Sequence, residues 1–387
     1  MLPYCRRNEA DDDSSIVGIK ECKGEYCRCF HDVVTNEFHH VDFPEAFGKT
    51  CRGGGFGWLA FTQETPSGFL INPATRQRID LPPITTLPGV VSYRPDRAGF
   101  EYVRQDVSFS DGEVYRVGES GSWMAHFYVN KIVMSTDPAH TDCVVMGLFE
   151  SCLGGLALCR PGLDAEWTAV VGSTNCYTDA VFWRDQFYAV DYLGNVDVIS
   201  YNPGDGLPTK SRWLSTLRDG RYLGINDHYL VENPSGELML VHRNKDWRDC
   251  DFPPQEREEL HFDGEEDTTH VAFHGPKARL DLYETAAFKV FELNRDDWER
   301  VDSVGDYALF VGGNRASFVS AEEYPRCRTN CIYFTDDYSE GHEAHCHGGY
   351  DIGVYDVGKG IVEPFSCRGL YDPVLIWPPP VWVFPSK

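Results

Sequence analysis

Residues 180–201 read AVFWRDQFYAVDYLGNVDVISY, and this stretch is the clearest indication of the fold. Apolar and aromatic residues dominate 180–183, 186–192 and 196–201, and polar turns at Arg184-Asp185 and Gly194-Asn195 separate the three runs. A Gly-Asn pair between two β-rich runs favours a hairpin, because tight hairpin turns need positive φ angles. Three consecutive short strands make up most of one blade of a β-propeller.

The same plan of strand, polar turn and strand recurs along the chain. Units of this kind lie near 16–44, 48–83, 127–172, 178–217, 221–303 and 306–366. Their spacing is irregular, unlike that of a WD40 or kelch array. The sequence therefore predicts an all-β protein with a single β-propeller over 16–387, of six irregular blades or, alternatively, seven. A last strand at 381–384 is expected to complete the first blade and close the ring, since an open sheet of this size would leave unpaired edges.

Three segments depart from this plan. Residues 1–15 are polar and are expected to form a disordered tail. The segment near 245–284 is rich in Asp and Glu and poor in strand formers, so we predict an acidic insertion between two strands of one blade. Residues 53–57 read GGGFG and are expected to form a flexible turn before a strand at 58–61.

Composition limits the partners and the compartment. A net charge of −25 repels phosphate backbones, so we expect no nucleic-acid partner. The sequence has neither an apolar run long enough to span a membrane nor the apolar core of a signal peptide, so no membrane partner is expected. The 14 cysteines are scattered, mostly within apolar runs, which indicates reduced thiols in the cytoplasm or the nucleus.

The sequence does not predict an enzyme, a cofactor or a metal site. His342, His345, Cys346 and His347 are too closely spaced on a Gly-flanked loop to converge easily on one tetrahedral zinc ion, and no CxxC pair completes a set. The run at 118–122 lacks the GxSxG spacing of a serine hydrolase.

Aromatic side chains near predicted turns and strand ends are the candidate contacts for a protein partner. They are Trp183, Tyr188, Tyr192, Tyr222 and Tyr229. Aromatic residues often anchor protein interfaces. The alternative for each of them is packing between blades.

The C-terminal third contains an ordered set of motifs: VGDYALFVG at 304–312, NCIYFTDD at 330–337, DIGVY at 351–355 and WPPPVWV at 377–383. Together they resemble the plant KIB-type F-box β-propeller family, also known as domain of unknown function 295. Residues 72–76 and 81–83, NPATR and LPP, resemble the outer hairpin of F-box-associated propellers in general.

This resemblance implies a propeller that presents a substrate protein while an F-box docks the ubiquitin-ligase adaptor Skp1. No F-box is visible before the first predicted strand, so docking of a Skp1-type adaptor is not expected of this chain by itself. The predicted function is a protein-interaction β-propeller, the substrate-recognition part of an SCF-type ubiquitin-ligase receptor that lacks its own F-box. The alternatives are a free-standing protein-binding scaffold unrelated to ubiquitination, and a small-ligand binder that uses the central channel.

Overall fold

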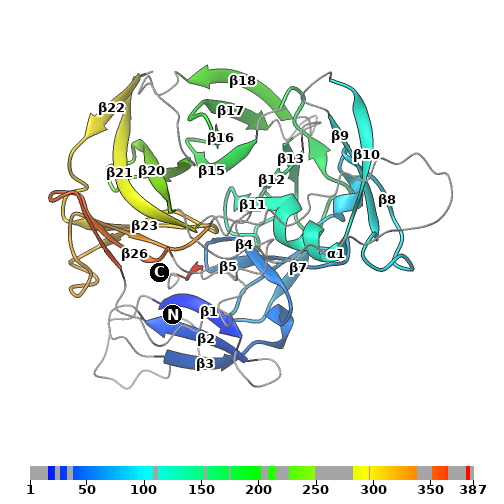
Figure 1. The fold of residues 1–387 in the computed structure, drawn as a ribbon, viewed down its shortest axis with the longest axis horizontal. Coiled ribbons are helices and arrows are strands. Elements are labelled where there is room, and N and C mark those ends of the chain that lie inside the picture. Colours follow the sequence, from blue (N-terminus) through cyan, green and yellow to red (C-terminus); the bar gives the residue numbers. More distant parts are fainter. Residues whose placement is uncertain are drawn as a thin grey trace.

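The computed structural model describes residues 16–21, 27–32, 38–107, 112–151, 155–173, 176–201, 208–214, 226–248, 282–295, 297–337, 351–364 and 381–383. Within these residues the strands form seven sheets, and Figure 1 shows most of them arranged around a common centre. No helix among them is long and apolar enough to cross a membrane.

Six of the sheets are blades, which we number 1 to 6 along the chain. Blade 1 contains β28 (Trp382–Val383), β1 (Ile16–Glu21), β2 (Cys27–Asp32) and β3 (Phe38–Asp42). Blade 2 contains β4 (Thr50–Gly55), β5 (Trp58–Thr62), β6 (Phe69–Ile71) and β7 (Arg78–Asp80). Blade 3 contains β11 (Val129–Met134), β12 (Val145–Phe149), β13 (Leu156–Cys159) and β14 (Thr168–Ala169).

Blade 4 contains β15 (Tyr177–Trp183), β16 (Gln186–Asp191), β17 (Val196–Tyr201) and β18 (Pro208–Leu214). Blade 5 contains β19 (Asn226–Glu232), β20 (Leu238–Arg248), β21 (Leu282–Asn294) and β22 (Asp297–Val301). Blade 6 contains β24 (Ser317–Ser320), β23 (Tyr307–Val311), β25 (Cys331–Phe334), β26 (Gly353–Asp356) and β27 (Ile361–Pro364). Blade 6 is unusual because β23 and β25 pair in parallel, whereas the other strand pairs in the blades are antiparallel.

The remaining elements connect blades 2 and 3, apart from η1 (Pro44–Ala46), which precedes β4. They are η2 (Ile84–Thr86), the sheet β8 (Val90–Tyr93), β9 (Tyr102–Val107) and β10 (Val114–Glu119), and the short helical segments α1 (Gly121–Trp123) and η3 (Met124–Tyr128).

The C-terminal strand closes the ring, as the sequence predicts. Val383 pairs with Ile16 and Trp382 with Val17, in antiparallel register, so β28 adds to blade 1 from the far end of the chain. The side chain of Trp382 is only 2% exposed. Its indole Nε1 donates to the carbonyl of Val311 in blade 6 at 2.7 Å, which joins the last blade to the first.

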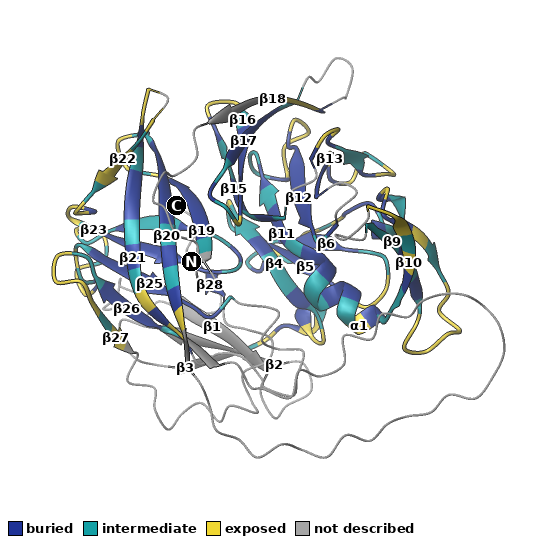
Figure 2. Ribbon diagram, turned by 45° about the horizontal axis from the view of Figure 1, so that its top comes forward, coloured by how far each residue is buried: buried dark blue, intermediate teal, exposed yellow. Residues whose placement is uncertain are grey.

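Six clusters of buried apolar side chains confirm the predicted count of six blades. Each cluster joins one pair of neighbouring blades, and together they follow the ring from blade 1 back to blade 1. Figure 2 shows buried residues along the central strands of the sheets and exposed residues mainly at the turns. Stability therefore comes from the faces of adjacent blades, where apolar area is removed from water.

The sheet β8–β10 was not predicted, and it lies outside the ring. Val90 and Tyr102 of this sheet belong to the apolar cluster between blades 2 and 3. The sheet does not separate these blades, because β4 of blade 2 and β11 of blade 3 contact each other directly. One reason the sequence analysis missed this sheet is that its buried face is partly charged. Arg104, which is 7% exposed, donates to Asp106 at 2.7 Å and to Glu119 at 3.0 Å. The buried face of this sheet therefore lacks the apolar sequence pattern of a typical strand.

The predicted turn in the glycine run at 53–57 occupies only its last two residues, and the first three are strand. Gly53, Gly54 and Gly55 belong to β4, and only Phe56 and Gly57 form the hairpin turn, with φ angles of 53° and 79°. Glycine is needed at 53 because an added Cβ would lie 2.1 Å from the carbonyl oxygen of Ile132 on β11. The run thus permits close packing of two blades.

The predicted tail at 1–15 lies outside the described residues, and so does most of the acidic segment, 249–281. The two strands that flank this segment, β20 and β21, pair with each other as far as Arg248 and Leu282.

Candidate functional site

The most concentrated polar chemistry in the described chain surrounds Arg243 on β20, a side chain with no exposed area. Its Nε donates to the hydroxyl of Thr285 at 2.8 Å, and Nη1 donates to the hydroxyl of Tyr229 at 3.0 Å. Nη1 also reaches Asp337 Oδ1 at 3.0 Å, and Nη2 reaches Asp351 Oδ2 at 2.9 Å. The guanidinium therefore bridges blade 5 to the two carboxylates of blade 6.

A buried lysine extends this cluster. Lys245, two residues further along β20, forms ion pairs with Asp227 and Asp337. Burial opposes its charge, but these carboxylates more than offset burial, and the pKa of Lys245 is raised. Burial by itself would raise the pKa of Asp337, but the positive charges of Lys245 and Arg243 hold this pKa below its usual value. Both groups are therefore charged near neutral pH. We name Asp227, Tyr229, Arg243, Lys245, Thr285, Asp337 and Asp351 the Arg243 network.

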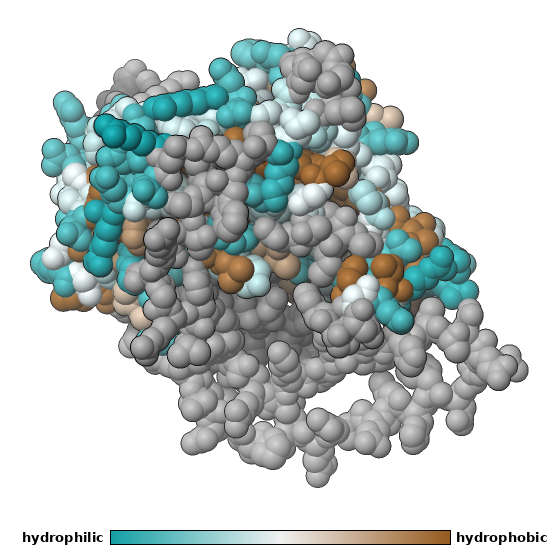
Figure 3. Space-filling view, turned by 90° about the horizontal axis from the view of Figure 1, so that it is seen from above, coloured by the Kyte–Doolittle hydropathy of each residue, from teal (hydrophilic) through white to brown (hydrophobic). Residues whose placement is uncertain are grey.

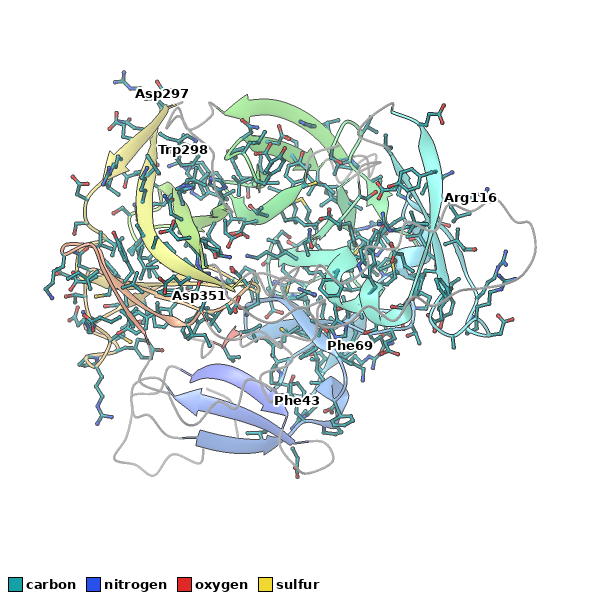
Figure 4. All side chains as sticks on the ribbon, viewed as in Figure 1. Phe43, Phe69, Arg116, Asp297, Trp298 and Asp351 are labelled. Atoms are coloured by element: carbon teal, nitrogen blue, oxygen red, sulfur yellow. The ribbon has the colours of Figure 1, made fainter. Side chains whose placement is uncertain are left out.

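The Arg243 network lies near the described residues that flank segments 249–281 and 338–350. Asp337 and Asp351 bracket residues 338–350, and Arg243 and Thr285 lie near the ends of the strands that bracket 249–281. Figure 4 shows Asp351 near the lower end of β21. The network therefore joins the two residues that flank 338–350 to the strands that flank 249–281.

A second buried ion pair joins three blades. Lys131 on β11 pairs with Asp179 Oδ1 on β15, and both side chains are at most 5% exposed. Asp179 Oδ2 accepts the backbone N–H of Leu230 on β19 at 2.9 Å. This pair and the Arg243 network have partners for their charges within the protein. These buried, paired charges link side chains of neighbouring blades.

Two histidines form a buried pair on neighbouring strands. His228 Nε2 lies 2.9 Å from His242 Nδ1, and His228 is 1% exposed. Burial, and secondarily His242, lowers the pKa of His228 to about 3. His228 Nδ1 is buried and has no hydrogen-bond partner among the described residues. His228 is therefore neutral at physiological pH.

This lowered pKa predicts a pH-dependent stability. Between about pH 6.5 and 3 the unfolded chain binds a proton at His228 that the folded chain does not, so the free energy of unfolding falls as pH falls. For one such proton the slope is at most about 1.4 kcal/mol per pH unit. Urea midpoints at pH 7.5, 6.0 and 5.0 should fall more steeply for the wild type than for His228→Phe. Parallel curves for the two proteins would contradict a neutral, buried His228.

The five predicted contact residues differ in how far they are exposed to solvent. Trp183 and Tyr188 are 6% and 8% exposed and pack edge to face at 5.3 Å between ring centres. Tyr229 is 3% exposed and belongs to the Arg243 network. Tyr192 is 52% exposed, in the turn between β16 and β17. Tyr222 lies outside the described residues. Contact with a partner stays a prediction for all five, and among the described four only Tyr192 displays its ring to solvent.

Sequence reasoning missed the Arg243 network, although β20 carries a signal. Met239, Val241, Arg243 and Lys245 alternate along the strand, and the first two belong to the apolar cluster between blades 5 and 6. Charged residues that continue an inward-facing apolar row indicate buried ion pairs.

The rest of the surface carries both hydrophilic and apolar side chains. Figure 3 shows separate apolar patches among hydrophilic side chains on one face. The exposed large apolar residues are Phe47, Phe56, Val91, Phe100, Val114, Leu163, Val171, Tyr192 and Ile361. Scattered apolar residues of this kind are normal for a protein surface, so they do not by themselves locate an interface.

A closed ring of six blades, joined by apolar clusters and by buried ion pairs such as those of Arg243 and Lys131, defines a β-propeller scaffold. The chain belongs to the KIB1-4 β-propeller family, whose family model matches residues 30–356. The resemblance found in the C-terminal motifs is thereby confirmed.

Relatives of the chain carry F-box names. The Arabidopsis thaliana "F-box protein SKIP23" is 26% identical over 266 residues, which cover 68% of this chain and 59% of that protein. The "Probable F-box protein At4g22165" of the same plant is 21% identical over 347 residues, covering 89% of this chain and 77% of that protein. The match thus spans about three-fifths of the length of SKIP23.

Likeness to solved structures is more distant. A complex of the dihydro-heme d1 dehydrogenase NirN matches over 94% of this chain and 55% of that chain, at a TM-score of 0.33 and 11% identity. A likeness at this level carries no argument about function.

Proposed function

We propose that this chain is the protein-recognition propeller of an SCF-type ubiquitin-ligase receptor, and that it binds a substrate protein without covalent chemistry. The observation that carries the proposal is membership of a propeller family together with relatives named as F-box proteins. The closed ring supports it, because a rigid scaffold can display turns in fixed positions with little loss of entropy on binding.

The turn that contains Tyr192 is the best candidate contact on this scaffold. The carboxylate of Asp191 accepts the backbone N–H groups of Leu193 at 2.9 Å and Asn195 at 2.8 Å, and the side-chain amide of Asn195 at 2.7 Å. The backbone N–H of Tyr192 donates to the carbonyl of Cys176 at 3.1 Å. The backbone is therefore fixed while the tyrosine ring stays exposed, and a preorganised aromatic side chain suits a binding anchor.

The proposal is tested by affinity purification of the tagged chain from plant extract. Recovery of Skp1 and a cullin together with a further protein supports the ligase role. Recovery of a protein partner without Skp1 and cullin favours the alternative of a free-standing scaffold. Because docking of Skp1 is not expected of this chain by itself, the extract must supply the F-box partner; if neither Skp1 nor cullin is then recovered, the ligase role fails for this chain.

Tyr192→Ala is expected to weaken binding of the recovered partner at least about tenfold, because truncating a central aromatic anchor costs 1.4 kcal/mol or more in typical interfaces. The measurement is a pull-down titration with the purified partner. The matched control is Leu163→Ala, a 59% exposed residue after the third strand of blade 3. Tyr192 precedes the third strand of blade 4, so the two residues lie at opposite ends of equivalent strands in neighbouring blades. Equal affinities for the wild type and Tyr192→Ala would remove this turn from the interface.

A further inference from the structure

Two arginines near the middle of the ring have no partner for their charge. Arg52 lies on β4, and Arg315 lies between β23 and β24. Within the part of the chain that the structure describes, neither guanidinium forms an ion pair or a hydrogen bond, and the Nε of Arg52 is buried without a partner. Both side chains are partly exposed, so solvent reaches them.

These two residues differ from the other interior cations. Arg104, Lys131, Arg243 and Lys245 are each paired with at least one carboxylate. The chain has an excess of 25 negative charges, so carboxylates are not scarce. Removing an unpaired guanidinium from water costs free energy unless an anion compensates it. Two such groups in one region therefore indicate a place for an anion from outside the chain.

Arg315 lies beside the end of the strand that carries Arg52. A Cβ added to Gly54 would lie 3.3 Å from Asn314 Nδ2, and one added to Gly55 would lie 3.7 Å from Arg315 Nη1. The end of β4 therefore lies against Asn314 and Arg315. This end, Gly55, is three residues after Arg52. Asn314 is held in place by Trp382, because its Nδ2 donates to the Trp382 carbonyl at 2.7 Å and its Oδ1 accepts the Trp382 N–H at 3.1 Å.

Both groups remain positively charged at neutral pH. Burial lowers the pKa of Arg52 to about 10, and burial also lowers the pKa of Arg315. A pKa of about 10 still leaves the guanidinium protonated at pH 7, so positive charge is available for a ligand.

We propose that Arg52 and Arg315 form a binding site for an oxyanion, a phosphate or carboxylate group of a small molecule, at the end of β4 beside Asn314. The planar fork of N–H donors on a guanidinium matches two oxygens of either group. Gly55 places no side chain beside the Arg315 guanidinium, since a Cβ added there would lie 3.7 Å from Arg315 Nη1 and, its chain neighbours aside, near no other group of the described residues. The site is independent of the proposed protein-recognition role and needs no adaptor.

The test measures the thermal midpoint of the purified chain against increasing inorganic phosphate, pyrophosphate and citrate, each compared with sodium chloride at the same ionic strength. A ligand that binds only the folded state raises the midpoint with its concentration. We expect a saturable rise that chloride does not produce. Pyrophosphate and citrate separate the two chemical sources, since a phosphate site favours the first and a carboxylate site favours the second.

Variants then locate the binding. Arg52→Gln and Arg315→Gln should each weaken binding at least about tenfold, as is usual when one partner of a charge-assisted pair is removed. Arg116→Gln, at an exposed arginine of β10, should bind as the wild type does. Without ligand, Arg52→Gln should melt at or above the wild-type midpoint because it removes an uncompensated charge. Arg52→Lys keeps the charge and should retain part of the binding.

The proposal is overturned by any of three results. The anions may produce no rise beyond that of chloride, the rise may persist unchanged in both glutamine variants, or both glutamine variants may fail to fold. The last result would show that the two guanidinium groups are needed for folding rather than for binding a ligand.

Discussion

Arg243→Met should lower the free energy of unfolding by about 3–5 kcal/mol, the usual cost of removing one partner of a buried ion pair. The methionine would leave Asp337 and Asp351 without their guanidinium partner in a site where Asp351 is 7% exposed. Tyr229 and Thr285 would also lose a hydrogen bond each. The measurement is urea unfolding at pH 7.5, with the change in midpoint multiplied by the slope of the linear extrapolation.

The matched control for this prediction is Arg116→Gln on β10, labelled in Figure 4 at the outer edge of the molecule. An exposed substitution of this kind should change the free energy of unfolding by less than about 0.5 kcal/mol. In the double variant Arg243→Met with Asp351→Asn, the loss in the free energy of unfolding should be smaller than the sum of the losses in the two single variants. The reason is that Asp351→Asn removes a carboxylate that Arg243→Met leaves unpaired. A loss below about 1 kcal/mol for Arg243→Met alone would mean that the network does not fasten blade 5 to blade 6.

Trp382→Ala should be similarly severe, with an expected loss of about 3–5 kcal/mol. The indole is 2% exposed, packs edge to face on Phe310 at 4.8 Å between ring centres, and donates to the Val311 carbonyl. Its removal leaves a cavity and unpairs a carbonyl where the last blade meets the first. Because β28 has only two residues, it has few other contacts with which to stay in place.

Hydrogen exchange separates ring opening from general destabilisation in this variant. Amides in the pair β1–β28 should exchange faster in Trp382→Ala, while those of β15–β17 should keep much of their protection. Trp298→Ala on the outer strand β22 is the control, since that indole is only partly buried, and a loss of about 1 kcal/mol is expected there. Uniform loss of protection over all blades would contradict a role confined to closure.

The strand pattern of this protein could be read from local sequence. Alternating apolar residues and turn-forming pairs locate the six blades, because each strand must bury its side chains against a neighbouring blade. The closing strand was predictable for a related reason, since an unpaired edge is costly and 381–384 is the last β-rich run. The sheet β8–β10 escaped this logic because Arg104 and its two carboxylates replace apolar residues on its buried face.

The chemistry of the interior depended on tertiary structure. Arg243 is separated by 94 residues from Asp337 and by 108 from Asp351, so only the closing of blade 6 onto blade 5 brings them together. The aromatic candidates show the same limit. Local pattern places Trp183, Tyr188 and Tyr192 close together in blade 4, but it does not distinguish a ring that packs inward from one that faces solvent.

An all-β chain, its six repeating units, its closing strand and its family could be predicted from periodicity and from motifs that are continuous along the chain. Which charges are paired and which side chains are exposed depends on the folded arrangement of the blades. Within the described residues Arg243 is paired, whereas Arg52 and Arg315 are not, because the distance between an arginine and a carboxylate depends on how separate blades meet around the ring.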